Sequence, residues 1–208
     1  MTILGTQLDA IQTLWFIKTA KCKIKTIINV GVGSAPEADI WKWLCPDVCV
    51  VGIDPRPKPR QWKYDYVKAA ACSKVFRRKF YCRRCRAMLC RSQERHKEHL
   101  KERLVVHVVT TTVDIVSRSY EPPYLLWVDV DGSELDVLEG STETMKHTPF
   151  IHVEMIPPGT YSGQIWDGDR TKRVHWYLRR SGYKIRKHYS ESHDSLYMKR
   201  PWNFNKAD

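Results

Sequence analysis

The stretch Thr26–Pro55 reads TIINVGVGSAPEADIWKWLCPDVCVVGIDP, and it predicts a strand, a glycine turn, a helix and a second strand, in that order. Its two apolar runs, residues 26–30 and 48–53, are rich in β-branched side chains and are typical of buried parallel strands. Between them, Pro36 stands where a first helical position is expected, with acidic residues behind it. The order is that of the repeating unit of an α/β sheet.

The turn of this unit has the features of a nucleotide site. Gly31 and Gly33 allow a tight backbone turn and the close approach of a ligand. Asp54 follows the second strand, where a carboxylate can accept both hydroxyl hydrogens of a ribose. A dinucleotide requires a fuller glycine cradle for its pyrophosphate, whereas S-adenosylmethionine has no pyrophosphate and needs only the close approach and the acid. The pattern therefore favours S-adenosylmethionine, and the alternative is an ordinary strand-turn-helix unit without a ligand.

The rest of the chain continues the alternation and predicts one domain over residues 1–208, with a basic, cysteine-rich insert at 75–103. Helices are expected at 6–20, at 132–145 with an interruption at Gly140, and at 171–181, and further strands at 66–72, 75–81, 104–113, 124–131 and 150–155. Residues 183–188 and 195–199 pair naturally as a terminal hairpin. The predicted fold is a Rossmann-like, doubly wound α/β sheet with an antiparallel C-terminal hairpin.

Four acidic residues follow the ends of predicted strands: Asp54, Asp129, Asp131 and Glu154. Because parallel strands end at one edge of a sheet, these residues are expected to converge there. Asp131 and Glu154 are the candidates to take a proton from a hydroxyl substrate. His152 is a weaker one, since its strand looks buried. A divalent cation on these carboxylates, or simple helix capping, are the alternatives.

Residues 126–140 read LWVDVDGSELDVLEG, which is similar to the signature of FkbM-type methyltransferases, and residues 151–154 fit that family's next strand. Asn29-Val30-Gly31-Val32-Gly33 resembles the first motif of class I S-adenosylmethionine-dependent methyltransferases. The resemblance implies O-methylation of a sugar or another small hydroxylated substrate. It also implies a cofactor site at Asn29, Gly31, Gly33, Asp54 and Asp129. Asp131 and Ser133 depart mildly from the signature, which usually has Glu and Ala there.

The resemblance to FkbM-type methyltransferases does not account for the basic, cysteine-rich insert at residues 75–103. The insert contains Cys82 and Cys85, separated by two residues, and then Cys90 and His96, a set that can hold a structural zinc ion. His99 is an alternative fourth ligand. A segment this poor in apolar residues gains order from a metal. The competing interpretation is a basic loop with free thiols.

Charge is unevenly distributed along the chain. The formal net charge is +12, and residues 56–103 hold 17 Lys and Arg against 4 Asp and Glu. Together with the aromatic residues Trp62, Tyr64 and Tyr66, this excess supports an alternative function, the binding or modification of nucleic acid on a methyltransferase fold. A solvated basic face is the simpler interpretation.

Compartment and membrane association follow from two further observations. The seven cysteines are an odd number, and the start of the chain lacks the features of a signal peptide, which predicts reduced thiols and a cytoplasmic location. No apolar run approaches the length of a membrane span.

Overall fold

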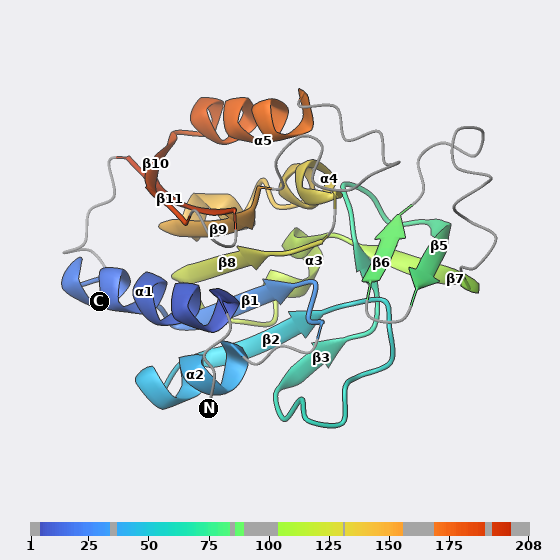
Figure 1. Cartoon of the computed structure of the whole chain (residues 1–208), viewed down its shortest axis with the longest axis horizontal. Helices are drawn as coiled ribbons and strands as arrows, with labels where there is room; N and C mark the ends of the chain where they lie inside the picture. The colour runs from blue at the N-terminus through green and yellow to red at the C-terminus, as the bar shows by residue number, and fades with distance from the viewer. Residues whose placement is uncertain are drawn as a thin grey trace.

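A computed structural model describes residues 5–33, 37–83, 86–89, 104–130, 132–155, 169–189 and 193–200. Its larger sheet has seven strands in the order β10-β11-β9-β8-β1-β2-β3 (Figure 1). The bounds of these strands are β1 Thr26–Val30, β2 Cys49–Ile53, β3 Asp65–Val67, β8 Tyr124–Val128, β9 Phe150–Glu154, β10 Tyr183–His188 and β11 Asp194–Lys199. Strands β3, β2, β1, β8 and β9 are parallel to one another, and β11 is antiparallel to both of its neighbours, β9 and β10. This arrangement confirms the predicted Rossmann-like sheet with its antiparallel C-terminal hairpin.

Helices cover both faces of this sheet. On one face, α1 (Gly5–Thr19) and α2 (Glu37–Leu44) bury Leu14 and Trp41 against strand residues such as Ile27. On the other face, α3 (Val113–Ser117), α4 (Glu134–Glu139) and α5 (Asp169–Arg180) bury a second apolar cluster. All residues of β1 and β8 are buried, which explains why both strands are apolar runs without alternation.

A smaller sheet has the order β4-β7-β5-β6. Its strands are β4 Ala70–Ala71, β5 Arg77–Arg83, β6 Arg86–Leu89 and β7 Leu104–Thr111. The single strand expected at 66–72 is therefore wrong: its first part is β3 in the larger sheet and its second part is β4 in the smaller one. Figure 1 shows the smaller sheet on the side toward which β1, β2 and β8 point. The assignment of residues 75–103 as an insert within one domain stays a prediction.

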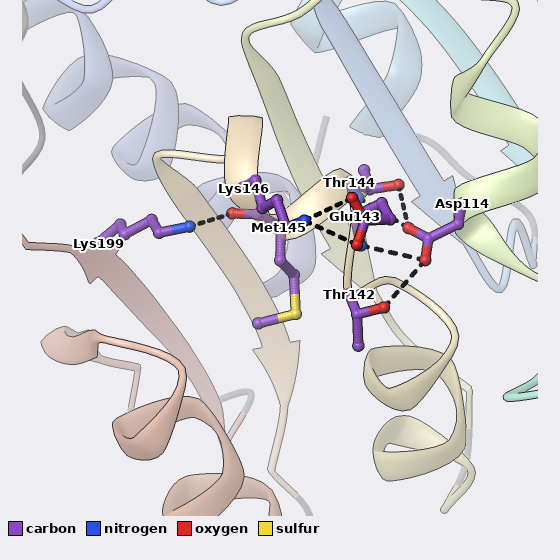
Figure 2. A network of polar contacts seen from close by, with 7 residues as sticks. All are labelled: Asp114, Thr142, Glu143, Thr144, Met145, Lys146 and Lys199. Carbon is purple, nitrogen blue, oxygen red and sulfur yellow. Dashed lines mark hydrogen bonds and ion pairs between the residues drawn. The ribbon is translucent and has the colours of Figure 1, made fainter.

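The interruption expected at Gly140 within the helix over 132–145 is confirmed. Helix α4 stops at Glu139, and Met145 belongs to a separate 3₁₀ helix, η1 (Thr144–His147). After this break, the carboxylate of Asp114 accepts hydrogen bonds from the backbone N–H groups of Glu143 (3.1 Å) and Thr144 (2.7 Å) and from the hydroxyl group of Thr144 (2.7 Å) (Figure 2). Glu143 precedes η1 and Thr144 is its first residue, so the carboxylate of Asp114, in α3, caps the start of η1.

From the other side, Lys199 donates to the carbonyl of Met145 at 2.5 Å (Figure 2). The two contacts hold the connection that leads into β9, and the strand itself is held by pairing with β8 and β11. No helix among the described residues is long and apolar enough to cross a membrane.

Candidate active site at the carboxyl edge of the sheet

The ends of four neighbouring strands stand at one level of the sheet. Ile53, Val30, Val128 and Val153 are register partners across β2, β1, β8 and β9. The next residue in each strand or turn is Asp54, Gly31, Asp129 or Glu154. The structure thus brings three of the four predicted acidic residues to one edge, with the glycine turn between the first two. Asp131, the fourth, lies outside the described residues.

Gly31 and Gly33 have positive φ angles of 90° and 54°, but their surroundings differ. A Cβ at Gly31 would lie 1.6 Å from the carbonyl oxygen of Asp129, which is backbone and cannot move aside. A Cβ at Gly33 would meet no described atom within 4 Å. The first glycine is therefore required for the packing of the turn against β8, whereas no described residue fills the space beside the second. A glycine at this position of the turn fits the close approach of a ligand.

The carboxylate of Asp54 is buried at the tip of β2 and is held by its own loop. It accepts hydrogen bonds from the backbone N–H of Arg56 (2.8 Å) and from Nε (2.9 Å) and Nη2 (2.6 Å) of the same residue. The backbone N–H of Gly33 donates a longer bond of 3.4 Å to its Oδ2 atom. Asp54 therefore connects the end of β2 to the turn after β1, where a nucleoside is expected. Arg56 was not predicted from the sequence, although a residue two positions after an aspartate often donates its backbone N–H to that carboxylate.

Asn29 lies one pleat before Gly31 on the face covered by α1 and α2, in register with Trp127 of β8. Its side chain is buried, and its Oδ1 atom has no hydrogen-bond partner among the described residues. A buried acceptor that remains unpaired is costly, and a donor from a ligand would relieve it. Together with the turn position at Gly33 and the acid at the tip of β2, this amide gives a donor and acceptor set that fits a nucleoside that carries an amino acid.

His152 is in the same register row and is fully buried, with its ring stacked on that of Trp127 (centroids 3.5 Å apart, 6° between planes). Its Nε2 atom is 3.7 Å from Oδ2 of Asp194, a separation within reach of an ion pair. Burial, however, lowers the pKa of His152 to about 3, so the ring is neutral near neutral pH and the contact is not an ion pair. The residue is a core histidine beneath the edge rather than a group that faces it.

The aromatic residues of the loop after β2 are engaged within the protein. Trp62 is buried, and its indole N–H donates to the carbonyl of Asp65 at 2.9 Å. Tyr64 donates to Asp39 Oδ1 at 2.6 Å, and Tyr66 donates to the carbonyl of Arg56 at 2.8 Å. Burial, and then the charge of Asp54, raise the pKa of Tyr66, so it stays a neutral donor. The use of these rings as stacking platforms for nucleic acid, which the sequence suggested, is wrong for Trp62, whose ring packs in the core.

The predicted zinc ligands cannot be placed. Cys85, Cys90 and His96 lie outside the described residues, and only the backbone of Cys82 is described, within β5. Among the residues that the structure does describe, no group of three or more His, Cys, Asp or Glu side chains can hold a metal ion. Both the zinc site and the divalent cation stay predictions.

A second basic surface escaped the sequence argument because acidic residues elsewhere balance its charge. Between residues 171 and 189 the chain has seven Lys and Arg and no Asp or Glu. Four of these side chains are exposed on α5, Lys172, Arg173, Arg179 and Arg180, and three on β10, Lys184, Arg186 and Lys187. The β10 cations do not all share the face of α5: Arg186 lies 5.0 Å from the ring of Phe16 and Lys187 donates to Gln12, both in α1 on the other face of the sheet. Trp176 is 58% exposed among the α5 cations, with the guanidinium of Arg180 at 4.6 Å from its ring. We call Lys172, Arg173, Trp176, Arg179 and Arg180 the α5 surface.

Three known proteins illustrate what this chain is similar to. The 2-O-methyltransferase NoeI of Sinorhizobium fredii (strain NBRC 101917 / NGR234) is 44% identical over 41 residues, which are 20% of this chain and 17% of that protein. The plantazolicin methyltransferase BpumL in complex with SAH is 10% identical, with a TM-score of 0.48, over 94% of this chain and 85% of that chain. The methyltransferase domain of bacterial-CtHen1-CN is 10% identical, with a TM-score of 0.44, over 94% of this chain and 100% of that chain.

The family is decided by a longer match. The model described as "Methyltransferase FkbM domain" matches residues 29–185, which begin at the last residues of β1 and reach into β10. This range contains the glycine turn, the tip of β2 and the ends of β8 and β9, so the whole edge described above lies within it. The chain therefore belongs to the methyltransferase FkbM domain family.

Proposed function

We propose that this protein is an S-adenosylmethionine-dependent O-methyltransferase that acts on a sugar or another small hydroxylated substrate. The observation that carries the proposal is the buried carboxylate of Asp54 at the tip of β2, joined to the backbone N–H of Gly33 in the turn after β1. Membership of the FkbM family supports the methyltransferase activity. The short match to a 2-O-methyltransferase supports oxygen as the atom that receives the methyl group.

In this proposal each edge residue has a stated role. Asp54 accepts hydrogen bonds from the ribose hydroxyl groups, and the backbone at Gly31 and Gly33 borders the methionine end, with Asn29 and Asp129 beside it. The cofactor, when bound, supplies a methyl group on a positively charged sulfur. A bond forms between the substrate oxygen and that methyl carbon as the sulfur–carbon bond breaks, and the hydroxyl proton passes to a carboxylate, for which Asp131 and Glu154 are the candidates.

Positioning is the main contribution that the chain makes to such a reaction. A displacement at carbon requires the attacking oxygen, the methyl carbon and the sulfur to lie in line. The edge supplies rigid supports for this, because β1 and β8 are buried along their whole length and β2 and β9 are buried at all but one residue. Glu154 ends β9 opposite Asp194 of β11, so its position is set by a paired strand rather than by a free loop.

The first test is binding of S-adenosylhomocysteine by calorimetry to the wild type and to Asp54→Ala. The loss of a pair of charge-assisted hydrogen bonds predicts weaker binding by about 1.5–3 kcal/mol. Asp47→Ala removes an exposed acid from the same half of the chain and serves as the control, with unchanged affinity expected. Equal affinity of the wild type and Asp54→Ala would refute the assignment of the ribose site. Transfer of label from S-adenosylmethionine to defined hydroxylated sugars then tests the acceptor.

A second candidate function, the binding of single-stranded nucleic acid, is favoured by the α5 surface. Its four exposed cations suit a phosphate backbone, and the exposed ring of Trp176 is available to stack on a base. This surface adds to the basic insert, which suggested the same function from the sequence. An alternative is that these charges only form a solvated helix face.

The two interpretations differ in their dependence on salt. If nucleic acid binds there, the double variant Arg173→Ala, Arg179→Ala should lower the slope of log affinity against log salt by about 1.4, since each phosphate contact to a single strand contributes about 0.7. The measurement is fluorescence anisotropy with a labelled oligonucleotide of mixed sequence. Lys18→Ala, Lys23→Ala removes the same charge from exposed positions elsewhere. Absence of binding by the wild type at low salt would exclude this function.

A further inference from the structure

The carboxylate of Asp54 has no acceptor capacity left in this structure. Its Oδ1 atom accepts from the backbone N–H and from Nε of Arg56, and its Oδ2 atom accepts from Nη2 of Arg56 and from the N–H of Gly33. A carboxylate offers about four lone-pair positions, two on each oxygen. Four donors from the protein therefore fill the group that is expected to receive two ribose hydroxyl groups.

Two of these four donors must leave before a ribose diol can bind, and the structure indicates which two. The donors from Gly33 and from the backbone of Arg56 belong to the main chain, and the hydroxyl group of Tyr66 holds the adjacent carbonyl of Arg56 at 2.8 Å. The other two are the Nε and Nη2 atoms of one guanidinium. They sit at the end of a flexible side chain that is 22% exposed, whereas the Asp54 side chain is 3% exposed.

We propose that the guanidinium of Arg56 is a built-in competitor for the ribose-binding carboxylate of Asp54, which leaves Asp54 when the nucleoside binds and so sets the affinity for the cofactor. This inference rests on the proposed function, because it requires Asp54 to bind a ribose. The geometry suits an exchange: the planar fork of Arg56 covers one oxygen with Nε and the other with Nη2, and the two hydroxyl groups of a ribose present the same number of donors.

The competitor also has a function when no exchange takes place. A carboxylate that is almost fully buried is costly without a paired charge, and Arg56 supplies that charge. Arg56 therefore stabilises the unliganded protein and opposes binding, so the two effects must change together when it is replaced. A residue with a purely structural role would change the stability alone.

The test compares the wild type with Arg56→Ala, Arg56→Lys and the control Arg60→Ala, which removes an equal charge from an exposed position of the same loop. The ligand is S-adenosylhomocysteine, whose net charge of zero avoids a general effect of removing a cation. We expect calorimetry to show binding by Arg56→Ala that is tighter than wild type, on the order of fivefold or more, since a charge-assisted pair no longer has to be broken. Arg56→Lys should be intermediate because an ammonium cannot cover both oxygens.

A second measurement needs no ligand. Denaturant unfolding of the wild type, Arg56→Ala, Asp54→Ala and the double variant gives the coupling energy between the two side chains. We expect each single substitution to lower the unfolding midpoint, and the double variant to be as stable as Asp54→Ala alone. Additive effects would overturn the inference, because the pair would then not exist in solution. Equal or weaker binding of S-adenosylhomocysteine by Arg56→Ala, with a wild type that binds, would overturn it while leaving the proposed function intact. Failure of both proteins to bind would overturn both.

Discussion

Gly31→Ala is expected to lose the native fold, whereas the same substitution at Gly33 is expected to keep it. A methyl group at Gly31 would lie 1.6 Å from the carbonyl oxygen of Asp129, and the backbone there has a φ of 90°. Either the turn or the end of β8 must move, and both are held, since Gly31 N–H donates to Ile53 and Asp129 N–H donates to Val30. We expect a loss of at least about 4 kcal/mol in the free energy of unfolding.

Gly33→Ala is the matched control because the residue type, the turn and the sign of φ are the same. Its φ of 54° lies in the left-handed region, where alanine costs about 1–2 kcal/mol, and no described atom stands in the way. Urea denaturation measures both variants. If Gly33 borders the cofactor, Gly33→Ala should also bind S-adenosylhomocysteine at least about tenfold more weakly while remaining folded. A Gly31→Ala protein with the stability of the wild type would show that the close contact with β8 does not exist.

The stability of the protein is expected to fall on acidification partly because of His152. Burial lowers its pKa to about 3, whereas an unfolded histidine has a pKa of about 6.5. Between these two values the unfolded chain binds a proton at this residue and the folded chain does not. Stability therefore rises with pH in this window: the contribution is fully present above about pH 6.5 and is lost progressively toward pH 3.

The variant His152→Phe keeps a flat ring to stack on Trp127 and removes the titration. We expect the difference in unfolding free energy between wild type and variant to change by about 1.4 kcal/mol per pH unit between pH 6 and pH 4. Chemical denaturation at several pH values measures it, and carboxylates that do not contact His152 cancel. His147→Phe, at an exposed position, is the control for the replacement of a histidine by phenylalanine. A constant difference across this range would mean that His152 titrates normally in the folded protein.

The sequence by itself determined the parallel core and predicted which acidic residues lie at its carboxyl edge. Residues 26–30 and 124–128 are apolar without alternation, which only a strand covered on both faces tolerates, and they became the adjacent strands β1 and β8. Asp54 was identified from its place at the end of such a run. These features are readable because strand burial and glycine turns depend on a few consecutive residues.

Tertiary structure decided what depends on partners far along the chain. The division of residues 66–72 between two sheets follows from pairing with β2 in one case and with β7 in the other, and neither partner is visible locally. The start of η1 depends on Asp114, which lies in a different helix. The need for glycine at Gly31 comes from the carbonyl of Asp129, about a hundred residues away in the printed sequence. Burial of Trp62 and saturation of Asp54 are likewise properties of packing, because a sequence pattern records which groups are present and not which neighbours occupy them.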